Sequence, residues 1–316
     1  MKGLTDIPGI RVGQVSDFQA ITGCTAILCD GLAVGGVDIR GSASGTQEID
    51  TLSPGHVTDR VHGILLAGGS AFGLEAAAGV RRYLAGKKVG FAFGGQYIPI
   101  VPAAILFDLG VGKSTLHPNA AMGEAAAAAA TAEAVSEGCV GAGTGASVGK
   151  LFGMTRAMKS GIGSYTVTLP GGVLVSALVA VNALGDVRDP ANLNIVAGAR
   201  KTAASREFVD SNAAMLQGAV IGGSTGNTTL AVVATNARLN KVQANKLAQF
   251  ASLGMARTIY PINTMSDGDV AFALSLGALQ ADINNLGVAA AEAVAQSILR
   301  AARLAKTMGG LPGLAG

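Results

Sequence analysis

The chain of 316 residues is long enough for one large domain or two ordinary ones. Hydrophobic residues make up 49% of the chain and charged residues only 14%, so it can bury a sizeable core. Because the net charge is only +3 and Lys and Arg form no stripe, the composition argues against a nucleic-acid partner.

Apolar periodicity and turn signals predict helices and strands that are interspersed along the chain. In chain order they are strands at 25–28 and 63–66, a helix at 72–84, an Ala-rich helix from 122 to 137, strands at 165–169, 173–181 and 229–235, and helices at 241–257 and 283–306. This order predicts an α/β or α+β fold. No linker-like stretch divides the chain, so we expect one compact domain spanning 1–316.

The first residues and the cysteines indicate where the protein resides. Polar Thr5 and Asp6 precede a Pro8-Gly9 turn, which is unlike a signal peptide. The longest aliphatic stretch, 173–181, is far shorter than the about 20 residues that cross a bilayer. The three cysteines have no pairing pattern and are typical of buried thiols in a reducing compartment. We therefore expect a cytoplasmic protein with no membrane partner.

Three short patterns resemble known sites but lack the context that those sites need. Residues 112–115 resemble the end of a phosphate-binding P-loop, but Phe107 stands where that motif needs a glycine. Residues 222–226 match a nucleophile elbow, but a strand follows them and every histidine lies upstream. Ser147 and Lys150 match a serine–lysine pair whose partner motifs are absent. Because the histidines also lack metal-ligand spacing, we expect no metal and no cofactor.

The junction between the glycine-rich loop at 222–226 and the following strand can carry chemistry. Glycine permits backbone conformations closed to other residues, and Asn227 tolerates them better than most. The hydroxyl of Thr228 can therefore lie close to the carbonyl group of its own preceding peptide bond. Attack there would give an ester by an N-to-O acyl shift, and water would then release a chain that starts at Thr228.

That product would combine a hydroxyl nucleophile and a free α-amino group on one residue. The amine has a reference pKa of about 7.7–8.0, so its neutral form can act as a general base near neutral pH. The alternative interpretation is an inert Thr-Thr pair at the entrance to a strand, which on spacing alone is the commoner case.

Four further segments, together with this junction, make nearly the whole chain resemble the L-aminopeptidase/D-esterase family, which includes β-aminopeptidases and the nylon-oligomer hydrolase. They are residues 37–46, 66–75, 141–150 and 266–269. The resemblance implies a four-layer αββα sandwich, similar to N-terminal-nucleophile hydrolases in layering but different in strand connection. It also implies cleavage between Asn227 and Thr228 into subunits 1–227 and 228–316, which stay together and assemble into a homo-oligomer of four or eight protomers.

The resemblance assigns roles to five side chains. Thr228 would attack the substrate carbonyl, and the ammonium of Lys150 would lower the pKa of the Thr228 amine. Asn182 would point its amide at the oxyanion, a contribution of about 3 kcal/mol to the barrier. Asp267 and Asp269 would hold the amine and hydroxyl of Thr228. The plainer alternatives are a lysine that caps a glycine turn, a satisfied buried amide and a solvated Asp-Gly-Asp turn.

Phe107 departs from the family pattern, because some members have a tyrosine there that helps to bind the oxyanion and Phe cannot donate a hydrogen bond. Phe107 is therefore a candidate substrate-pocket residue, and either the substrate class differs or a backbone N–H replaces the tyrosine. The resemblance predicts a self-cleaving hydrolase of short peptides or small amino-acid amides and oligomers that works through an acyl-enzyme. Two rivals are an acyltransferase of the ornithine acetyltransferase type and an uncleaved, non-catalytic member of the fold.

Overall fold

The computed structural model describes residues 2–222 and 226–316. Its central feature is a nine-stranded sheet in the order β10-β11-β14-β16-β2-β4-β7-β3, with β1 paired to β2. These strands are β1 (Ile10–Asp17), β2 (Thr22–Ile39), β3 (Gly45–Gln47), β4 (Val61–Ala67), β7 (Ala103–Ile105), β10 (Ile162–Leu169), β11 (Val173–Asn182), β14 (Thr228–Ala237) and β16 (Val270–Leu279).

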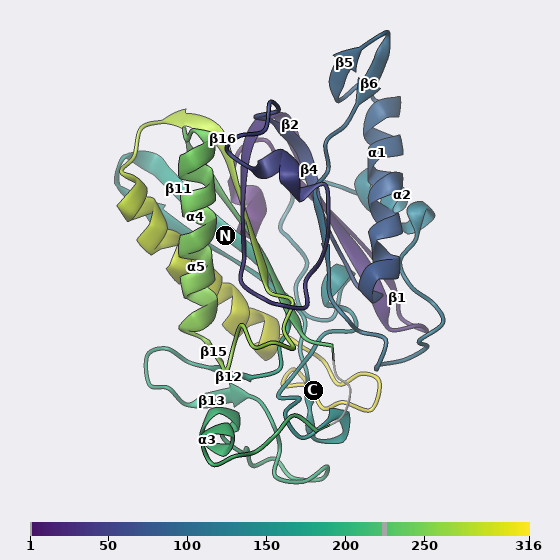
Figure 1. Cartoon of the computed structure of the whole chain (residues 1–316), viewed down its shortest axis with the longest axis vertical. Helices are drawn as coiled ribbons and strands as arrows, with labels where there is room; N and C mark the ends of the chain where they lie inside the picture. Colours follow the sequence, from purple (N-terminus) through teal and green to yellow (C-terminus); the bar gives the residue numbers. More distant parts are fainter. Residues whose placement is uncertain (1, 223–225) are drawn as a thin grey trace.

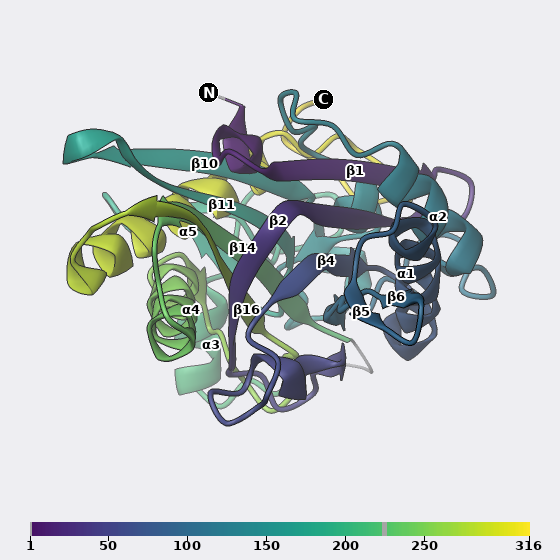
Figure 2. The same cartoon turned by 90° about the horizontal axis from the view of Figure 1, so that it is seen from above.

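Helices cover the two outer faces of this sheet, which folds back on itself (Figures 1 and 2). Helices α4 (Lys241–Ala256) and α5 (Ile283–Arg303) pack against the part formed by β10, β11, β14 and β16. Helices α1 (Ala76–Gly86) and α2 (Ala120–Ala128) cover the part formed by β1, β2 and β4. A third apolar cluster lies between the two parts of the sheet. The layers therefore run α, β, β, α, which confirms the predicted sandwich.

The alternation of side chains along each central strand explains this layering, as β14 illustrates. Ala231 and Val233 point into the cluster under α4 and α5, whereas Leu230 and Val232 point into the cluster between the two parts of the sheet. A strand that is buried on both faces has a nearly continuous apolar sequence. The β-branched run at 229–235 therefore becomes a central strand rather than an edge.

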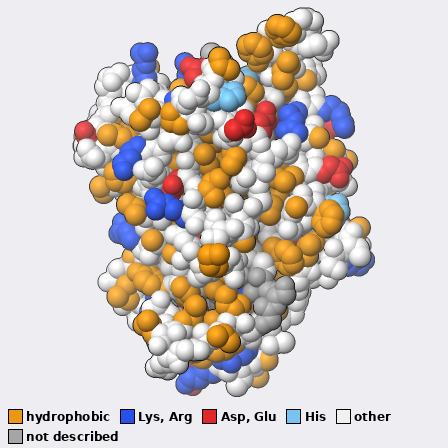
Figure 3. Space-filling model, viewed as in Figure 1, with side chains coloured by type: hydrophobic (Ala, Val, Ile, Leu, Met, Phe, Trp, Pro, Cys, Tyr) orange, Lys and Arg blue, Asp and Glu red, His pale blue; other side chains and the backbone are white. Residues whose placement is uncertain are grey.

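The remaining elements are short and lie around this core. A hairpin projects beside α1 and carries hydrophobic side chains on its surface, among them the exposed Phe91 and Phe93 (Figures 1 and 3). The short strands and α-helix are β5 (Phe91–Phe93), β6 (Gln96–Ile98), β8 (Ser147–Val148), β9 (Met158–Lys159), β12 (Asp186–Arg188), β13 (Ile195–Ala197), β15 (Ile259–Tyr260) and α3 (Ser211–Leu216). The 3-10 helices are η1 (Gly3–Asp6), η2 (Ile49–Leu52), η3 (Ser70–Glu75), η4 (Gly141–Gly143), η5 (Met154–Arg156) and η6 (Pro170–Gly172).

Two predicted helices need correction. The helix predicted at 72–84 begins as the 3-10 helix η3 and becomes α-helical only in α1. The Ala-rich helix predicted to reach 137 ends at Ala128. Beyond it Thr131 exchanges two backbone hydrogen bonds with Val12, at 2.9 and 3.1 Å, so pairing with β1 replaces the next helical turn. Helix propensity is a weak prior against such tertiary pairing.

The other predicted elements are confirmed, and so is the burial of the thiols. Each predicted strand lies within an observed strand, and α4 and α5 begin at the predicted residues. All three cysteines are free and buried, and burial raises the pKa of Cys24 and of Cys29 to about 12. Within residues 2–222 and 226–316, no helix combines the length and the apolar character that a membrane crossing requires.

Candidate active site

Strand order brings the predicted site residues together at one end of the sheet. Thr228 is the first residue of β14 and pairs with Asn182, the last residue of the antiparallel strand β11. On its other side β14 runs parallel to β16. Asp269 immediately precedes β16, and Asp267 lies two residues earlier. Lys150 follows β8 and reaches the same end, where its ammonium group contacts Asn182. All five predicted side chains are buried.

The peptide bond before Thr228 is held by hydrogen bonds on its carbonyl oxygen. The Thr228 hydroxyl donates to the Asn227 carbonyl oxygen at 2.5 Å. The backbone N–H of Gly268 donates to the same oxygen at 2.8 Å. A side chain at position 268 does not fit, because its Cβ would lie 2.9 Å from the Thr228 hydroxyl oxygen and 2.7 Å from the Ala43 carbonyl oxygen. This backbone donor has no signature in the sequence, and sequence reasoning missed it.

Lys150 is a buried cation surrounded by oxygen atoms. Its Nζ donates to the carbonyl oxygens of Gly226 and Asn182, both at 2.9 Å, and to Oδ1 of Asn182 at 3.0 Å. Burial lowers the Lys150 pKa to about 7, although the charge of Asp267 opposes this shift. Near neutral pH this side chain is therefore present both as an ammonium and as a neutral amine.

The amide of Asn182 has a fixed orientation. Its Oδ1 accepts from Lys150 Nζ, from the Ser147 N–H at 3.1 Å and from the Ser147 hydroxyl at 3.4 Å. Its Nδ2 donates to the carbonyl oxygens of Phe107 at 2.9 Å and of Gly226 at 3.4 Å. Ser147 therefore orients this amide, a contribution that sequence reasoning missed. Its only signal was its place three residues before Lys150.

The two carboxylates flank Gly268 but hold different partners. Oδ2 of Asp267 accepts from the hydroxyl and the N–H of Thr264, at 2.5 and 3.0 Å. Oδ1 of Asp269 accepts from the N–H of Thr229 at 2.6 Å. Burial raises the pKa of Asp269 to about 7, and the charge of Asp267 adds to the shift.

The predicted contact of these carboxylates with Thr228 is not made in the uncut chain. Among the described residues, neither Asp267 nor Asp269 is hydrogen-bonded to the Thr228 hydroxyl, which donates to the Asn227 carbonyl instead. The α-amino group of Thr228 would exist only after cleavage. Asp269 reaches the neighbouring residue, so it lies next to the position of that amine.

Phe107 packs against the residue that precedes Asn227. A Cβ added to Gly226 would lie 2.2 Å from Cγ of the Phe107 ring. The two residues border a cavity of about 20 Å³, room for about one water molecule. Its lining consists of Phe107, Asp108, Gly110, Val111, Ser147, Lys150, Met154 and Gly226.

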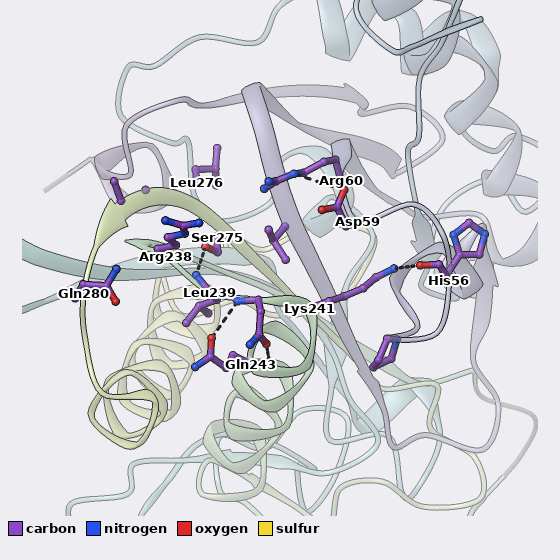
Figure 4. A pocket seen from close by; sticks show the side chains of 15 residues that line it. His56, Asp59, Arg60, Arg238, Leu239, Lys241, Gln243, Ser275, Leu276 and Gln280 are labelled. Atoms are coloured by element: carbon purple, nitrogen blue, oxygen red, sulfur yellow. Dashed lines mark hydrogen bonds and ion pairs between the residues drawn. The ribbon is translucent and has the colours of Figure 1, made fainter.

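A far larger hollow of about 790 Å³ lies elsewhere, between α4 and the β2–β4 side of the sheet (Figure 4). It is lined by Arg60, Arg238 and Lys241, and the last of these donates to the His56 carbonyl at 3.3 Å. In the described part of the chain, none of the predicted catalytic residues lines this hollow. Its size therefore does not identify the site.

The patterns rejected in the sequence analysis supply no second site. Gly112 of the P-loop-like segment lies in a bend with φ of 74°. Residues 223–225 of the elbow pattern lie outside the described residues. His62 accepts the N–H of Ile100 at 3.0 Å and packs as a core residue. The described residues contain no group of three or more His, Cys, Asp or Glu that could hold a metal ion.

Solved structures of other proteins share this fold. A β-aminopeptidase from Burkholderia sp. superposes with a TM-score of 0.70 at 24% identity, over 99% of this chain and 90% of that one. The L-aminopeptidase D-Ala-esterase/amidase from Ochrobactrum anthropi, described as a variant of the Ntn hydrolase fold, gives a TM-score of 0.71 at 18% identity. That superposition covers 98% of this chain and 88% of the other.

Sequence relatives extend the likeness over the full length. An uncharacterized aminopeptidase of Mycobacterium tuberculosis (strain H37Rv) is 36% identical over 340 residues, which covers 99% of this chain and 96% of that protein. A 6-aminohexanoate-oligomer endohydrolase of Kocuria sp. is 32% identical over 314 residues, with 94% of this chain and 85% of that protein covered. The model of peptidase family S58 matches residues 2–315. The chain therefore belongs to peptidase family S58 and is a hydrolase.

Proposed function

We propose that the chain cleaves its own backbone between Asn227 and Thr228 and then uses Thr228 as the N-terminal nucleophile of an amide hydrolase. The observation that carries this proposal is the 2.5 Å contact between the Thr228 hydroxyl and the Asn227 carbonyl oxygen. The same oxygen accepts the N–H of Gly268 at 2.8 Å. A donor in this position would stabilise the oxyanion that forms during attack.

In the first reaction the Thr228 oxygen attacks the carbonyl carbon of Asn227. The hydroxyl proton passes to the Thr228 nitrogen, the peptide C–N bond breaks, and Asn227 becomes an ester of Thr228. Water then hydrolyses the ester and leaves a carboxylate on Asn227. Thr228 gains a free amine and regains its hydroxyl, so its base and its nucleophile belong to one residue.

In the second reaction the amine of Thr228 takes the proton of its own hydroxyl as that oxygen attacks the substrate. The nearby ammonium of Lys150 lowers the pKa of this amine and so favours its basic form. Nδ2 of Asn182, which donates to the carbonyl oxygens of Phe107 and Gly226 before the cut, would then donate to the substrate oxyanion. Asp267 and Asp269 hold the new amine. The substrate C–N bond then breaks, the protonated Thr228 amine gives its proton to the leaving amine, and the acyl group remains as an ester on Thr228. Water hydrolyses this ester, which releases the acyl group as a carboxylic acid and restores the hydroxyl.

Short peptides and amino-acid amides or oligomers are the substrates that we propose. Relatives that match nearly the whole chain carry the names aminopeptidase and 6-aminohexanoate-oligomer endohydrolase. Both names describe hydrolysis of an amide bond next to an amino acid unit. Each cut chain would form a heterodimer, and the heterodimers would assemble further.

The mass of the purified protein tests the first reaction. We expect fragments of 227 and 89 residues (316 − 227 = 89), the second beginning with Thr228. Thr228→Val keeps the shape but lacks the hydroxyl, so it should stay a single chain of 31.2 kDa. Thr228→Ser keeps the hydroxyl and should still be cut. Cleavage of the Val variant at this bond would refute the assignment of the nucleophile.

Substrate assays test the second reaction against its rivals. Release of the amine product without any acceptor indicates a hydrolase, whereas a requirement for an acceptor amine indicates an acyltransferase. An uncut wild-type chain without activity would instead support the non-catalytic alternative.

A further inference from the structure

We propose that Phe107 restricts the shape of the acyl group on which Thr228 acts. In self-cleavage, Phe107 allows only a residue without a side chain at position 226. In the cut enzyme, Phe107 allows only an acyl chain that is unbranched at its fifth atom, where the reacting carbonyl carbon is the first atom. This inference rests on the proposed function, because it concerns the acyl side of the same nucleophile.

The contact between Gly226 and Phe107 leaves no room for a side chain. A Cβ on Gly226 would lie 2.2 Å from Cγ, 2.3 Å from Cβ and 2.8 Å from Cδ1 of Phe107. Carbon atoms at contact are about 3.5–4.0 Å apart. Because one of the obstructing atoms is the Phe107 Cβ itself, rotation of the ring cannot relieve the overlap. Only a movement of the main chain could do so.

Hydrogen bonds hold the main chain on both sides of this contact. The Gly226 carbonyl accepts from Lys150 at 2.9 Å and from Asn182 at 3.4 Å. The Phe107 carbonyl accepts from Asn182 at 2.9 Å, so one amide fixes both partners. Leu106, the residue before Phe107, is tied at its N–H to the Ala67 carbonyl at 2.9 Å. The two segments therefore cannot separate without the loss of several buried hydrogen bonds.

The substrate inherits this restriction because the same oxygen attacks both carbonyl groups. In the uncut chain the acyl side begins at the Asn227 carbonyl carbon, and its fifth atom is Cα of Gly226. After the cut, an acyl chain that replaces residues 226–227 on this path places its own fifth atom against Phe107. A cavity of about 20 Å³ lies beside Gly226, and Val111 and Met154 are among its apolar walls. A methylene group fits at this position, whereas a branched carbon meets the ring.

Self-cleavage of position-226 variants provides the first test. Gly226→Ala should slow the appearance of the 89-residue fragment at least 100-fold, while Gly222→Ala, whose Cβ would come no closer than 3.3 Å to Leu151, should be cut at the wild-type rate. Phe107→Gly removes the three atoms nearest to the added Cβ and should restore cleavage of Gly226→Ala to within 10-fold of the Phe107→Gly single variant. Phe107→Ala keeps its Cβ and should not restore it.

The second test compares two anilides that differ by one methyl group. Their acyl groups are 6-aminohexanoyl and 6-amino-5-methylhexanoyl, which carry an unbranched and a branched fifth carbon. The cut wild type should prefer the unbranched anilide at least 30-fold in kcat/KM, within the range that one methyl group can give in an apolar pocket. In Phe107→Gly the preference should fall to about 3-fold, whereas Phe107→Ala, which keeps the Cβ that lies 2.3 Å from the branch position, should retain it.

Distinct outcomes separate this inference from the proposed function. Gly226→Ala cut at the wild-type rate, or a cut wild type that hydrolyses both anilides equally or neither of them, overturns the role of Phe107. A wild-type chain that is never cut between Asn227 and Thr228 contradicts the proposed function instead. Thermal melting of each variant, compared with that of Thr228→Val, identifies any that has failed to fold.

Discussion

Two buried lysines, Lys150 and Lys159, carry amines whose protonation depends on pH near neutrality. Burial lowers the pKa of Lys150 to about 7 and that of Lys159 to about 8. An unfolded lysine has a pKa of about 10.4. Between these values the unfolded chain binds more protons than the folded chain, so the free energy of unfolding rises with pH.

This difference in bound protons predicts that the free energy of unfolding of the uncut variant Thr228→Val depends on pH between pH 7 and 9. Each lysine contributes about 1.4 kcal/mol per pH unit once the pH exceeds its folded pKa. Lys150→Met in the same background should therefore lower the slope between pH 8 and 9 by about 1.4 kcal/mol per pH unit, as measured by urea unfolding. Cys24 and Cys29, with pKa raised to about 12, act in the opposite direction from about pH 8 upward, but they do so equally in both variants and cancel in this comparison. An unchanged slope would show that Lys150 is charged throughout this range.

Asn182→Asp removes one donor from the site while the side chain keeps its size and its acceptor oxygen. The loss of the Nδ2 hydrogen that faces Phe107 and Gly226 should lower kcat on a small amide by about 10²–10³-fold. Ser147→Ala is the milder comparison, since the backbone N–H of Ser147 still orients the amide. Activity must be normalised to the fraction of cut chains. Equal kcat in Asn182→Asp and the wild type would exclude this amide as the oxyanion donor.

The residues that sequence could and could not identify differ in kind. Thr228, Lys150, Asn182, Asp267 and Asp269 are reactive side chains within motifs, so a resemblance could name them, and the fold gathers them at one end of the sheet. The other contributions come from a backbone N–H, from a glycine pressed against a ring and from short turns. These contributions depend on how the backbone folds in three dimensions and not on the type of side chain. A short sequence pattern therefore could not predict them.

At the level of elements, burial rather than helix propensity determines how much each helix contributes to the stability of the fold. Helix α5 shows this with two valines six residues apart: Val294 is buried in the cluster under β10 and β11, whereas Val288 is 67% exposed. The Ala-rich α2 shows the converse, because its sequence favours a helix well beyond Ala128 but pairing with β1 ends it. Tertiary contacts thus set helix ends that composition alone misplaces.

The same substitution at the two valines of α5 measures this effect. Val294→Ala should lower the free energy of unfolding by about 2 kcal/mol, because it removes two buried methyl groups and leaves a cavity. Val288→Ala should change it by less than about 0.5 kcal/mol. Both can be measured by urea unfolding in the Thr228→Val background. Equal losses at the two sites would mean that the exposed face of α5 is covered in solution.

For the whole molecule, the proposed cut would divide the chain into two segments whose strands are interleaved in one sheet. The segment 228–316 supplies β14 and β16, which lie between β11 and β2 of the segment 1–227. β14 pairs with β11 from Asn182↔Thr228 to Val175↔Thr235, and β16 pairs with β2 from Val270↔Ile39 to Ser275↔Val34. Helix α5 also packs on β10 and β11. Each fragment alone would expose the face that the other buries.

The two fragments should therefore behave as one particle until they are denatured. We expect the cut wild type and the uncut Thr228→Val variant to elute together in gel filtration, and the 89-residue fragment to separate only in denaturant. Hydrolysis of one peptide bond removes none of the strand pairs on either side of β14, so the cut can create a new chain end without opening the sheet. Elution of the small fragment by itself in native buffer would show that the β14–β16 pair is not held between β11 and β2 in solution.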